Sequence, residues 1–409
     1  MHAYHLFTII ILVTTAFTYI NHKFLRWPVT IAVTLFSFVI SVLLILFKKL
    51  LPDLNGLLIE NIVAVDFRKI VMEILLGFLL FSAAFKLDGK KLKKDAGPII
   101  AMAFFSTLLS TLFVGSLMFY TFRILHQEIS FINCLLFGAL ISPTDPVAVL
   151  GVLRKLKIPE RFETKVTGES LINDGIAIVI FTLLLRESEN PGSTALFPDG
   201  ILLFLREAAG GVAFGLLLGW AALLLLRSTK NYKVEILITL SVVMGGYQLA
   251  QLLEVSSPIA MVMGGLVCSA EGKKDAYHIS DDDVITFWDL AEDLINVVLF
   301  LLIGVEVFII PLSSSILVTG VVAIVWVLVS RFISLVPVYA VFRKNFAPYS
   351  LKLLTWGALR GAVSIALVLS LPRQLYRTEF LAITYMIAVF SIVVQGLTIR
   401  PLAKRLLPS

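Results

Sequence analysis

This chain has few charged residues and few cysteines for its length. Lys, Arg, Asp and Glu make up 15% of its 409 residues, whereas soluble proteins contain about 25%. So low a share excludes an ordinary water-soluble domain. The two cysteines, Cys134 and Cys268, lie in separate apolar runs, which excludes a disulfide framework and a cysteine-based metal site.

The chain consists instead of a succession of long apolar runs. Hydrophobic residues make up 58% of the sequence, and the mean hydropathy is +0.95. Each run has about 18 to 27 residues, enough to cross a hydrocarbon core of about 30 Å as a helix. We therefore predict an all-α polytopic membrane protein whose residues 1–409 form a single transmembrane domain, with no separate soluble domain. About thirteen spans are predicted, at 3–21, 27–47, 67–85, 98–122, 131–152, 163–185, 200–226, 233–253, 256–270, 284–309, 314–342, 351–371 and 379–401.

The net charge of +6 is concentrated in alternate loops, such as those at 86–94 and 154–165. With thirteen spans, this pattern places most Lys and Arg on one side, which is the positive-inside asymmetry of membrane proteins. We expect the N-terminus outside and the C-terminus in the cytoplasm. The basic excess thus indicates a lipid bilayer as partner, and no nucleic acid.

The fifth predicted span carries an acid between two prolines, in Ser142-Pro143-Thr144-Asp145-Pro146. A carboxylate at bilayer depth costs at least ~2.5 kcal/mol, so it persists only where it faces a cavity, a partner or a transported ion. Each proline removes a backbone donor and disfavours helix before it. We expect the freed carbonyls of Ser142 and Thr144 to line a cavity as oxygen ligands beside Asp145. The alternative is a proline kink in which Asp145 caps the next helical turn.

The sixth predicted span adds a stripe of polar side chains. Ser170 and Asp174 are four residues apart on one helical face, and Glu169 and Asn173 share the adjacent face. A hydroxyl, an amide and a carboxylate together suit a hard cation, which prefers oxygen ligands. The alternative is that these groups only join helices by hydrogen bonds, which fits Asp174 poorly.

Arg331 and Arg360 are the basic residues deep within the predicted spans. Arg360 lies between Gly357 and Gly361 in the twelfth span, seven spans after the fifth. An odd offset gives opposite orientation, as in inverted-repeat transporters whose interrupted helices meet at the midplane. We predict that Glu169 and Arg360 form a structural ion pair between the sixth and twelfth spans. No partner for Arg331 can be identified.

Several stretches resemble the signatures of the monovalent cation:proton antiporters, in the NhaP/NHE branch. They are Thr144-Asp145-Pro146-Val147-Ala148-Val149, Gly168-Glu169-Ser170-Leu171-Ile172-Asn173-Asp174, Leu359-Arg360-Gly361-Ala362-Val363-Ser364, and the stretch 287–292 followed by 299–304. The resemblance covers essentially the whole chain. The Asn173-Asp174 pair resembles the electroneutral branch of the family.

The resemblance implies a homodimer with the NhaA/NhaP-like antiporter fold and two interrupted crossing helices. It implies that Asp174 and Asp145 are the acids of the Na⁺ and proton site, Thr144 and Ser170 its oxygen ligands, and Asn173 its supporting amide. Glu169 and Arg360 match the family's structural ion pair. Ser82 departs from the pattern, because many members have an acidic residue at this position. Without that acid the site lacks a possible extra ligand, which leaves the ion selectivity open. The missing regulatory tail of animal relatives suggests a prokaryotic protein of the cell membrane.

We therefore predict a secondary active transporter and not an enzyme. It would exchange Na⁺, with Li⁺ and K⁺ as further candidates, for H⁺ by electroneutral alternating access, and it would need no cofactor. A K⁺-selective proton antiporter or a cation channel is the alternative within transport. An intramembrane aspartyl protease using Asp145 and Asp174 is the alternative from another class, but its Gly-x-Gly-Asp pattern is missing.

Overall fold

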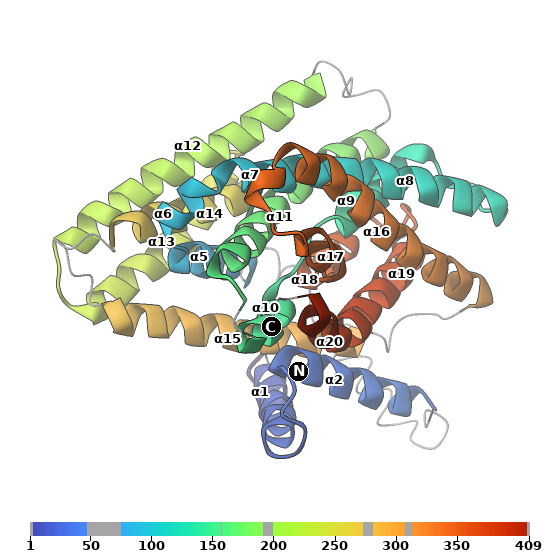
Figure 1. Ribbon diagram of the computed structural model, residues 1–409, viewed down its shortest axis with the longest axis horizontal. Helices are drawn as coiled ribbons and strands as arrows, with labels where there is room; N and C mark the ends of the chain where they lie inside the picture. The colour runs from blue at the N-terminus through green and yellow to red at the C-terminus, as the bar shows by residue number, and fades with distance from the viewer. Residues whose placement is uncertain are drawn as a thin grey trace.

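The structure is a bundle of helices that follow the predicted spans (Figure 1). This computed structural model describes residues 3–46, 75–156, 158–190, 199–272, 281–306 and 313–406. Within these ranges the regular structure is helical, which confirms the all-α prediction. Residues 67–74 of the third predicted span lie outside the described residues, and the total of thirteen spans stays a prediction.

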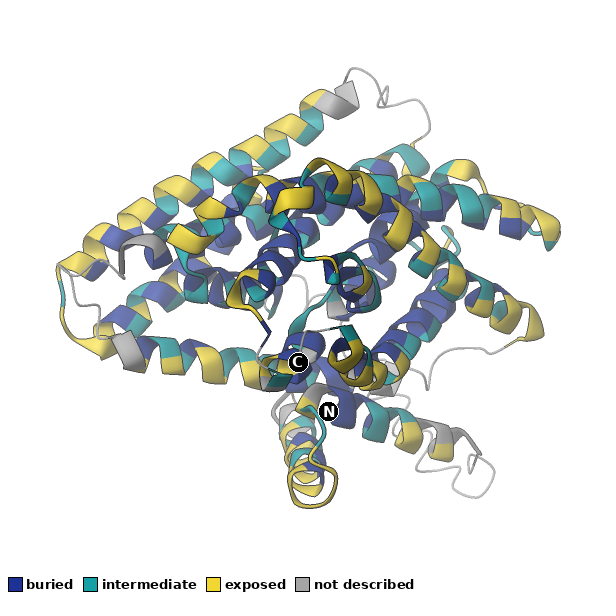
Figure 2. Cartoon of the chain, viewed as in Figure 1, coloured by how far each residue is buried: buried dark blue, intermediate teal, exposed yellow. Residues whose placement is uncertain are grey.

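Seven helical stretches of the described chain are long and apolar enough to cross a membrane. They are Thr8–Leu25, Ala96–Ile124, Glu160–Glu189, Leu202–Arg227, Tyr232–Leu252, Ser314–Val341 and Arg377–Leu406. Large apolar side chains also lie exposed on outer faces, among them Leu217 and Trp220 of α12 (Asp199–Arg227), a helix with exposed residues along its length (Figure 2). Apolar side chains on the outside are expected where a helix faces lipid.

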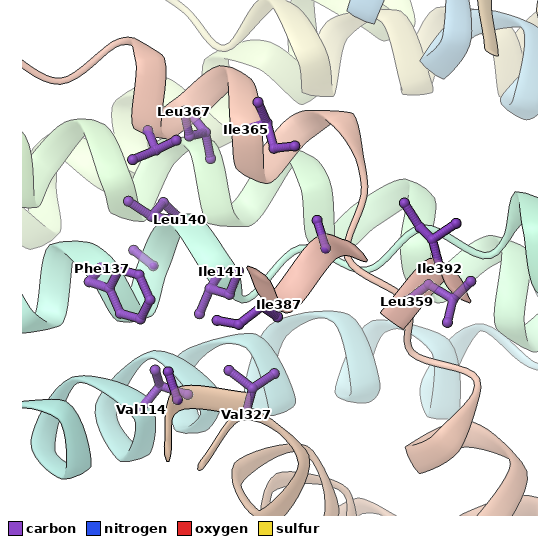
Figure 3. Packing of buried hydrophobic residues seen from close by; sticks show 14 of the residues in the cluster. Val114, Phe137, Leu140, Ile141, Val327, Leu359, Ile365, Leu367, Ile387 and Ile392 are labelled. Carbon is purple, nitrogen blue, oxygen red and sulfur yellow. The ribbon is translucent and has the colours of Figure 1, made fainter. Parts of the chain in front are cut away.

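One group of helices packs around the larger hydrophobic core. We call it the crossing group, because the two interrupted helices described below pack with it. It comprises α8 (Thr107–Ile124), α9 (Phe131–Ile141), α11 (Glu160–Glu189), α16 (Ser314–Val341) and α19 (Arg377–Phe390). Buried side chains from several of these helices, such as those of α8, α9 and α16, lie close together (Figure 3). Burial of this apolar surface stabilises the group as one unit.

A second group, the flanking group, has a core of its own. It comprises α5 (Leu76–Lys86), α12, α13 (Tyr232–Leu252) and α14 (Ser257–Gly272). Trp288, near the start of α15 (Asp281–Glu306), is fully buried in this core. Its ring centroid lies 5.1 Å from that of Phe81. α11 and α15 contribute buried residues to both cores, so the two groups meet along these helices.

The fifth predicted span is interrupted, as its prolines indicate. α9 ends at Ile141, and α10 (Val147–Leu153) begins only after the extended residues 142–146. Pro143 and Pro146 account for the gap, since each lacks an N–H for a helical hydrogen bond and clashes with the preceding turn.

The twelfth predicted span is interrupted at the matching place. α17 (Ser350–Trp356) and α18 (Ala362–Leu369) are separated by residues 357–361. The two extended segments pair antiparallel, and the Asp145 N–H donates to the Leu359 carbonyl at 2.8 Å. The predicted pair of interrupted, crossing helices is therefore confirmed. We call residues 142–146 and 357–361 the crossing.

A π-helical segment, η7 (Ser391–Gln395), supports the second break. The Arg360 N–H donates to the Ser391 hydroxyl oxygen at 3.0 Å, and Gln395 Nε2 donates to the Trp356 carbonyl at 2.8 Å. Backbone groups freed by a broken helix must be satisfied inside the protein at membrane depth. Side chains of η7 do this for the end of α17 and for the extended segment after it.

Candidate ion-binding site

A cavity of about 1190 Å³ reaches the crossing. Its walls come from α1 (Ala3–Ile20), α5, α11 and α15, together with both extended segments. The cavity is therefore lined by helices of both groups, such as α11 and α5. Four of the residues predicted from the sequence line it, namely Asp174, Asp145, Ser170 and Thr144.

Asp174 faces this cavity from the middle of α11. Its side chain is half-buried, and no hydrogen bond or ion pair engages its carboxylate within the part of the chain that the structure describes. A carboxylate at this depth without a protein partner is costly unless water, a proton or a cation meets it. Asp174 therefore has the character of an ion-binding group.

Asp145 contacts the start of a helix and lines the cavity. Its Oδ1 accepts a hydrogen bond from the Val147 N–H at 2.9 Å, at the start of α10. Pro146 occupies the N-cap position itself, so Asp145 binds the first helical N–H from the residue before the cap, and its carboxylate still lines the cavity. An ionised carboxylate has about four lone-pair sites, so one backbone donor leaves most of its acceptor capacity for a ligand.

Gly361 allows the second extended segment to approach Asp145. A Cβ built at Gly361 would lie 2.8 Å from the Cβ of Asp145 and would also collide with its carboxylate. Real Cβ atoms do not come so close. The glycine is therefore required by the close approach of the two segments.

Two side chains of α11 hold Thr144 in place. The Ser170 hydroxyl donates to the Thr144 carbonyl, and Asn173 Nδ2 donates to Thr144 Oγ1 at 2.8 Å. Asn173 is fully buried and lies behind the cavity wall, where its Nδ2 also donates to Glu169 Oε1 at 3.2 Å. This placement fits a supporting role for Asn173 and leaves the oxygens of Thr144 and Ser170 at the cavity.

The prediction that Glu169 pairs with Arg360 is wrong. Arg331 Nη1 and Nη2 each donate to one oxygen of the Glu169 carboxylate at 2.8 Å, and both side chains are buried. Arg331 also donates to the Ser106 hydroxyl at 3.2 Å. A bidentate pair of this kind is the strongest arrangement open to Arg and a carboxylate. It ties α11 to α16.

Arg360 binds backbone carbonyls instead. The expectation that the carbonyls of Ser142 and Thr144 are free to act as ion ligands is therefore wrong. Its Nη1 donates to the Ser142 carbonyl and, at 2.7 Å, to the Pro143 carbonyl. The carbonyl of Thr144 accepts from Ser170. The backbone oxygens released by the break in α9 are therefore bound by protein donors. Carboxylates and hydroxyls are left as the main oxygen groups of the site.

The structure adds further groups to the cavity wall. Ser364, one turn after Gly361, lines the cavity, and its buried hydroxyl has no partner among the described residues. Lys86 and Glu292 also line the cavity and form an ion pair with a 2.7 Å N–O distance. Ser364 could have been predicted to lie near the site, because it follows Gly361 by one helical turn. No local sequence pattern predicts that Lys86 contacts Glu292.

Comparison with known proteins points to a single family. A family model described as "Sodium/hydrogen exchanger, transmembrane" matches residues 9–405. The chain is 39% identical to the Na(+)/H(+) antiporter NhaP of Pseudomonas aeruginosa, over 97% of this chain and 95% of that protein. It is 32% identical to the Na(+)/H(+) antiporter NhaH of Halobacillus dabanensis, over 94% and 93% of the two chains. The solved sodium proton antiporter MjNhaP1 from Methanocaldococcus jannaschii matches with a TM-score of 0.74 and 18% identity over 98% of each chain, a likeness of fold.

Proposed function

This chain belongs to the sodium/hydrogen exchanger family, and we propose that it exchanges Na⁺ for H⁺ across the membrane. It is a multi-pass membrane transporter and not an enzyme. The observation that carries the proposal is the Asp174 carboxylate, which faces the cavity without a partner among the described residues.

Competition for Asp174 supplies the coupling. The ionised carboxylate binds a monovalent cation together with the Asp145 carboxylate and the hydroxyls of Thr144 and Ser170, since hard cations prefer oxygen ligands. A proton on Asp174 neutralises the carboxylate, so the cation loses its main charged ligand and dissociates. A site that is both empty and charged is costly to carry through a low-dielectric region, so each crossing carries either a cation or a proton. One cation for one proton makes the exchange electroneutral.

The position of the cavity supports alternating access. Its walls combine the crossing, which carries Asp145, with residues of α5 and α15. Displacement of the crossing group along the flanking group would expose the acids to opposite sides in turn. Lys86, Lys91 and Arg154 of the basic loops line the same cavity, so by the positive-inside rule it faces the cytoplasm.

The buried hydrogen bonds around the crossing keep the ligand oxygens in place. Asn173 connects Thr144 to the Glu169–Arg331 pair, and Arg360 holds the carbonyls before Thr144. Binding groups locked by a second layer of contacts keep their geometry as the ion comes and goes. We further propose a homodimer in a prokaryotic cell membrane, with the N-terminus outside and the C-terminus in the cytoplasm. Li⁺ and K⁺ are further candidate substrates.

Exchange in proteoliposomes tests the proposal. Dissipation of a pH gradient is measured after addition of Na⁺, Li⁺ or K⁺, with and without a clamped membrane potential. The wild type should respond to Na⁺ at a rate that the clamp leaves unchanged. Asp174→Asn should abolish exchange and keep its thermal transition. The matched control is Glu163→Gln, a cavity-lining acid of α11 that pairs with the exposed Arg154 and should exchange normally.

Three outcomes would contradict the proposal or part of it. Substantial exchange by Asp174→Asn would remove Asp174 from the site. A response to K⁺ without one to Na⁺ would make the protein a K⁺-selective exchanger. Current without a proton gradient in a bilayer recording would indicate a channel.

A further inference from the structure

A polar cluster lies on the wall of the cavity formed by α5 and α15. The Ser82 hydroxyl donates to Glu292 Oε2 at 2.8 Å, and Lys86 Nζ lies 2.7 Å from the same oxygen. Lys86 Nζ also lies 2.8 Å from Asp289 Oδ1. The Glu292 side chain is 16% exposed, compared with 56% for Asp289. Glu292 is thus an inner acid of the cavity, and Asp289 an outer one.

The Glu292 carboxylate keeps a free oxygen. Both of its contacts use Oε2, and Oε1 has no partner among the residues that the structure describes. Glu292 lines the same cavity as Asp174 and Asp145. The free oxygen is therefore accessible to an ion in the cavity.

Asn296 gives a second, independent indication of a ligand. It lies one helical turn beyond Glu292 on α15, is 5% exposed and lines the cavity, and its Nδ2 has no partner in the described part of the chain. Buried polar groups without a partner are rare in folded proteins. The Asn296 Oδ1 likewise has no partner among the described residues, and an amide oxygen is an acceptor of the kind that hard cations prefer.

We propose that Glu292 and Asn296 form a second monovalent-cation site in the cavity, with Lys86 as a tethered competitor for the Glu292 carboxylate. This inference rests on the proposed function, because the site holds the same cation before it reaches Asp174. Residues of α5, of α15 and of the crossing line this one cavity. A cation at Glu292 can therefore pass to Asp174 within one cavity.

The arrangement of charges makes displacement of Lys86 feasible. The ammonium contacts Glu292 and Asp289 together, so a cation that takes Glu292 leaves Lys86 paired with Asp289. The Asp289 side chain is 56% exposed, so the ammonium keeps a partner and contact with water when it leaves Glu292. Asp289, Glu292 and Asp293 face the cavity with Lys86, and this acidic excess concentrates cations at the wall.

Na⁺ kinetics of three variants test the inference in proteoliposomes at one pH. Glu292→Gln should raise the apparent KM for Na⁺ about ten-fold and change the maximal rate less than two-fold. Lys86→Gln removes the competitor and should lower the apparent KM at least three-fold. Ser82→Glu combined with Glu292→Gln should return the KM toward the wild-type value, because it restores a carboxylate on the residue whose hydroxyl lies 2.8 Å from Glu292 Oε2. Glu163→Gln is the control, and thermal melting is recorded for each variant.

Opposite shifts for Glu292→Gln and Lys86→Gln distinguish a binding site from a structural contact. If the pair only joins α5 to α15, both variants lose stability and their KM values move together or not at all; this result, or an unchanged KM for Glu292→Gln, overturns the inference. The proposed function fails separately, if the wild type itself shows no exchange or if Asp174→Asn exchanges normally.

Discussion

Glu169 and Arg331 form a bidentate ion pair between α11 and α16, with both N–O distances at 2.8 Å. Asn173 joins this pair to Thr144, at 3.2 Å from Glu169 Oε1 and 2.8 Å from Thr144 Oγ1. A continuous series of buried contacts thus runs from α16 to the extended segment that carries Asp145. The ion site depends on a charge pair that does not itself line the cavity.

Arg331→Ala should therefore unfold the protein more easily. It leaves Glu169 charged and unpaired in the interior, which costs about 3–5 kcal/mol of unfolding free energy. Thermal melting in detergent measures the effect. The double variant Glu169→Gln with Arg331→Met removes both charges and should recover most of the loss. Melting of Arg331→Ala at the wild-type temperature would contradict this role.

Arg360→Met should lower both stability and transport. It removes the donor from the Ser142 and Pro143 carbonyls, and each buried acceptor left without a partner costs about 1–3 kcal/mol. Since these carbonyls precede Thr144 and Asp145, the maximal rate of exchange should fall well below the wild type at temperatures where the variant is folded. A variant with normal Na⁺ exchange would show that Arg360 does not maintain the site.

Gly361→Ala should abolish or severely reduce exchange. The added Cβ would collide with the Asp145 side chain, and the crossing must open to accommodate it. The matched control is Gly151→Ala on α10, a cavity-lining glycine whose Cβ would meet nothing within 4 Å. Initial rates of Na⁺-dependent pH-gradient dissipation measure both variants. Equal losses in the two would show that the close approach at Gly361 is not the cause.

Asp95, in the turn before α7 (Ala96–Ala101), gives a prediction about pH. Burial alone raises the pKa of Asp95, but two 2.7 Å hydrogen bonds from Arg161 and the charge of Lys165 outweigh it, so the pKa lies below its usual value. A carboxyl with a lowered folded pKa contributes stability above its unfolded pKa of about 3.9 and loses it as pH falls through the folded pKa.

Asp95→Asn should therefore melt at a lower temperature than the wild type at pH 7. The difference should begin to shrink as pH falls below about 4, because the unfolded chain then binds a proton at Asp95 before the folded protein does. Melting curves between pH 7 and pH 3.5 measure the difference. A gap that is constant over this range would show that the charge of Asp95 does not contribute.

The helical spans could be predicted because the bilayer imposes a simple requirement. A helix needs about 20 apolar residues to cross, and the observed helices, such as α11 and α16, lie within a few residues of the predicted runs. The two breaks were visible for a local reason too. Pro143 and Pro146 cannot continue a helix, and the matching break follows Gly357.

The site acids could also be found from the sequence, because a carboxylate in an apolar run requires an explanation wherever the chain folds. The contacts that surround these acids could not be predicted from the sequence. Helical spacing places Glu169 and Asn173 on one face of α11, but does not determine which distant helix meets that face. Two buried arginines were candidates for Glu169, and the packing of α16 against η3 (Met102–Ser106) and α11 selected Arg331.

The sequence by itself determined the class of protein, the spans, the two breaks and the acids at the cavity, because each of these follows from local composition and the cost of charge in lipid. Only the tertiary structure decided the pairing of Glu169 with Arg331, the binding of the Ser142 and Pro143 carbonyls by Arg360, and the contact of Ser82 with Glu292. These contacts join residues 162 to 218 positions apart. Which distant faces meet depends on how the helices rotate and pack as they bury surface together, and no local pattern encodes that.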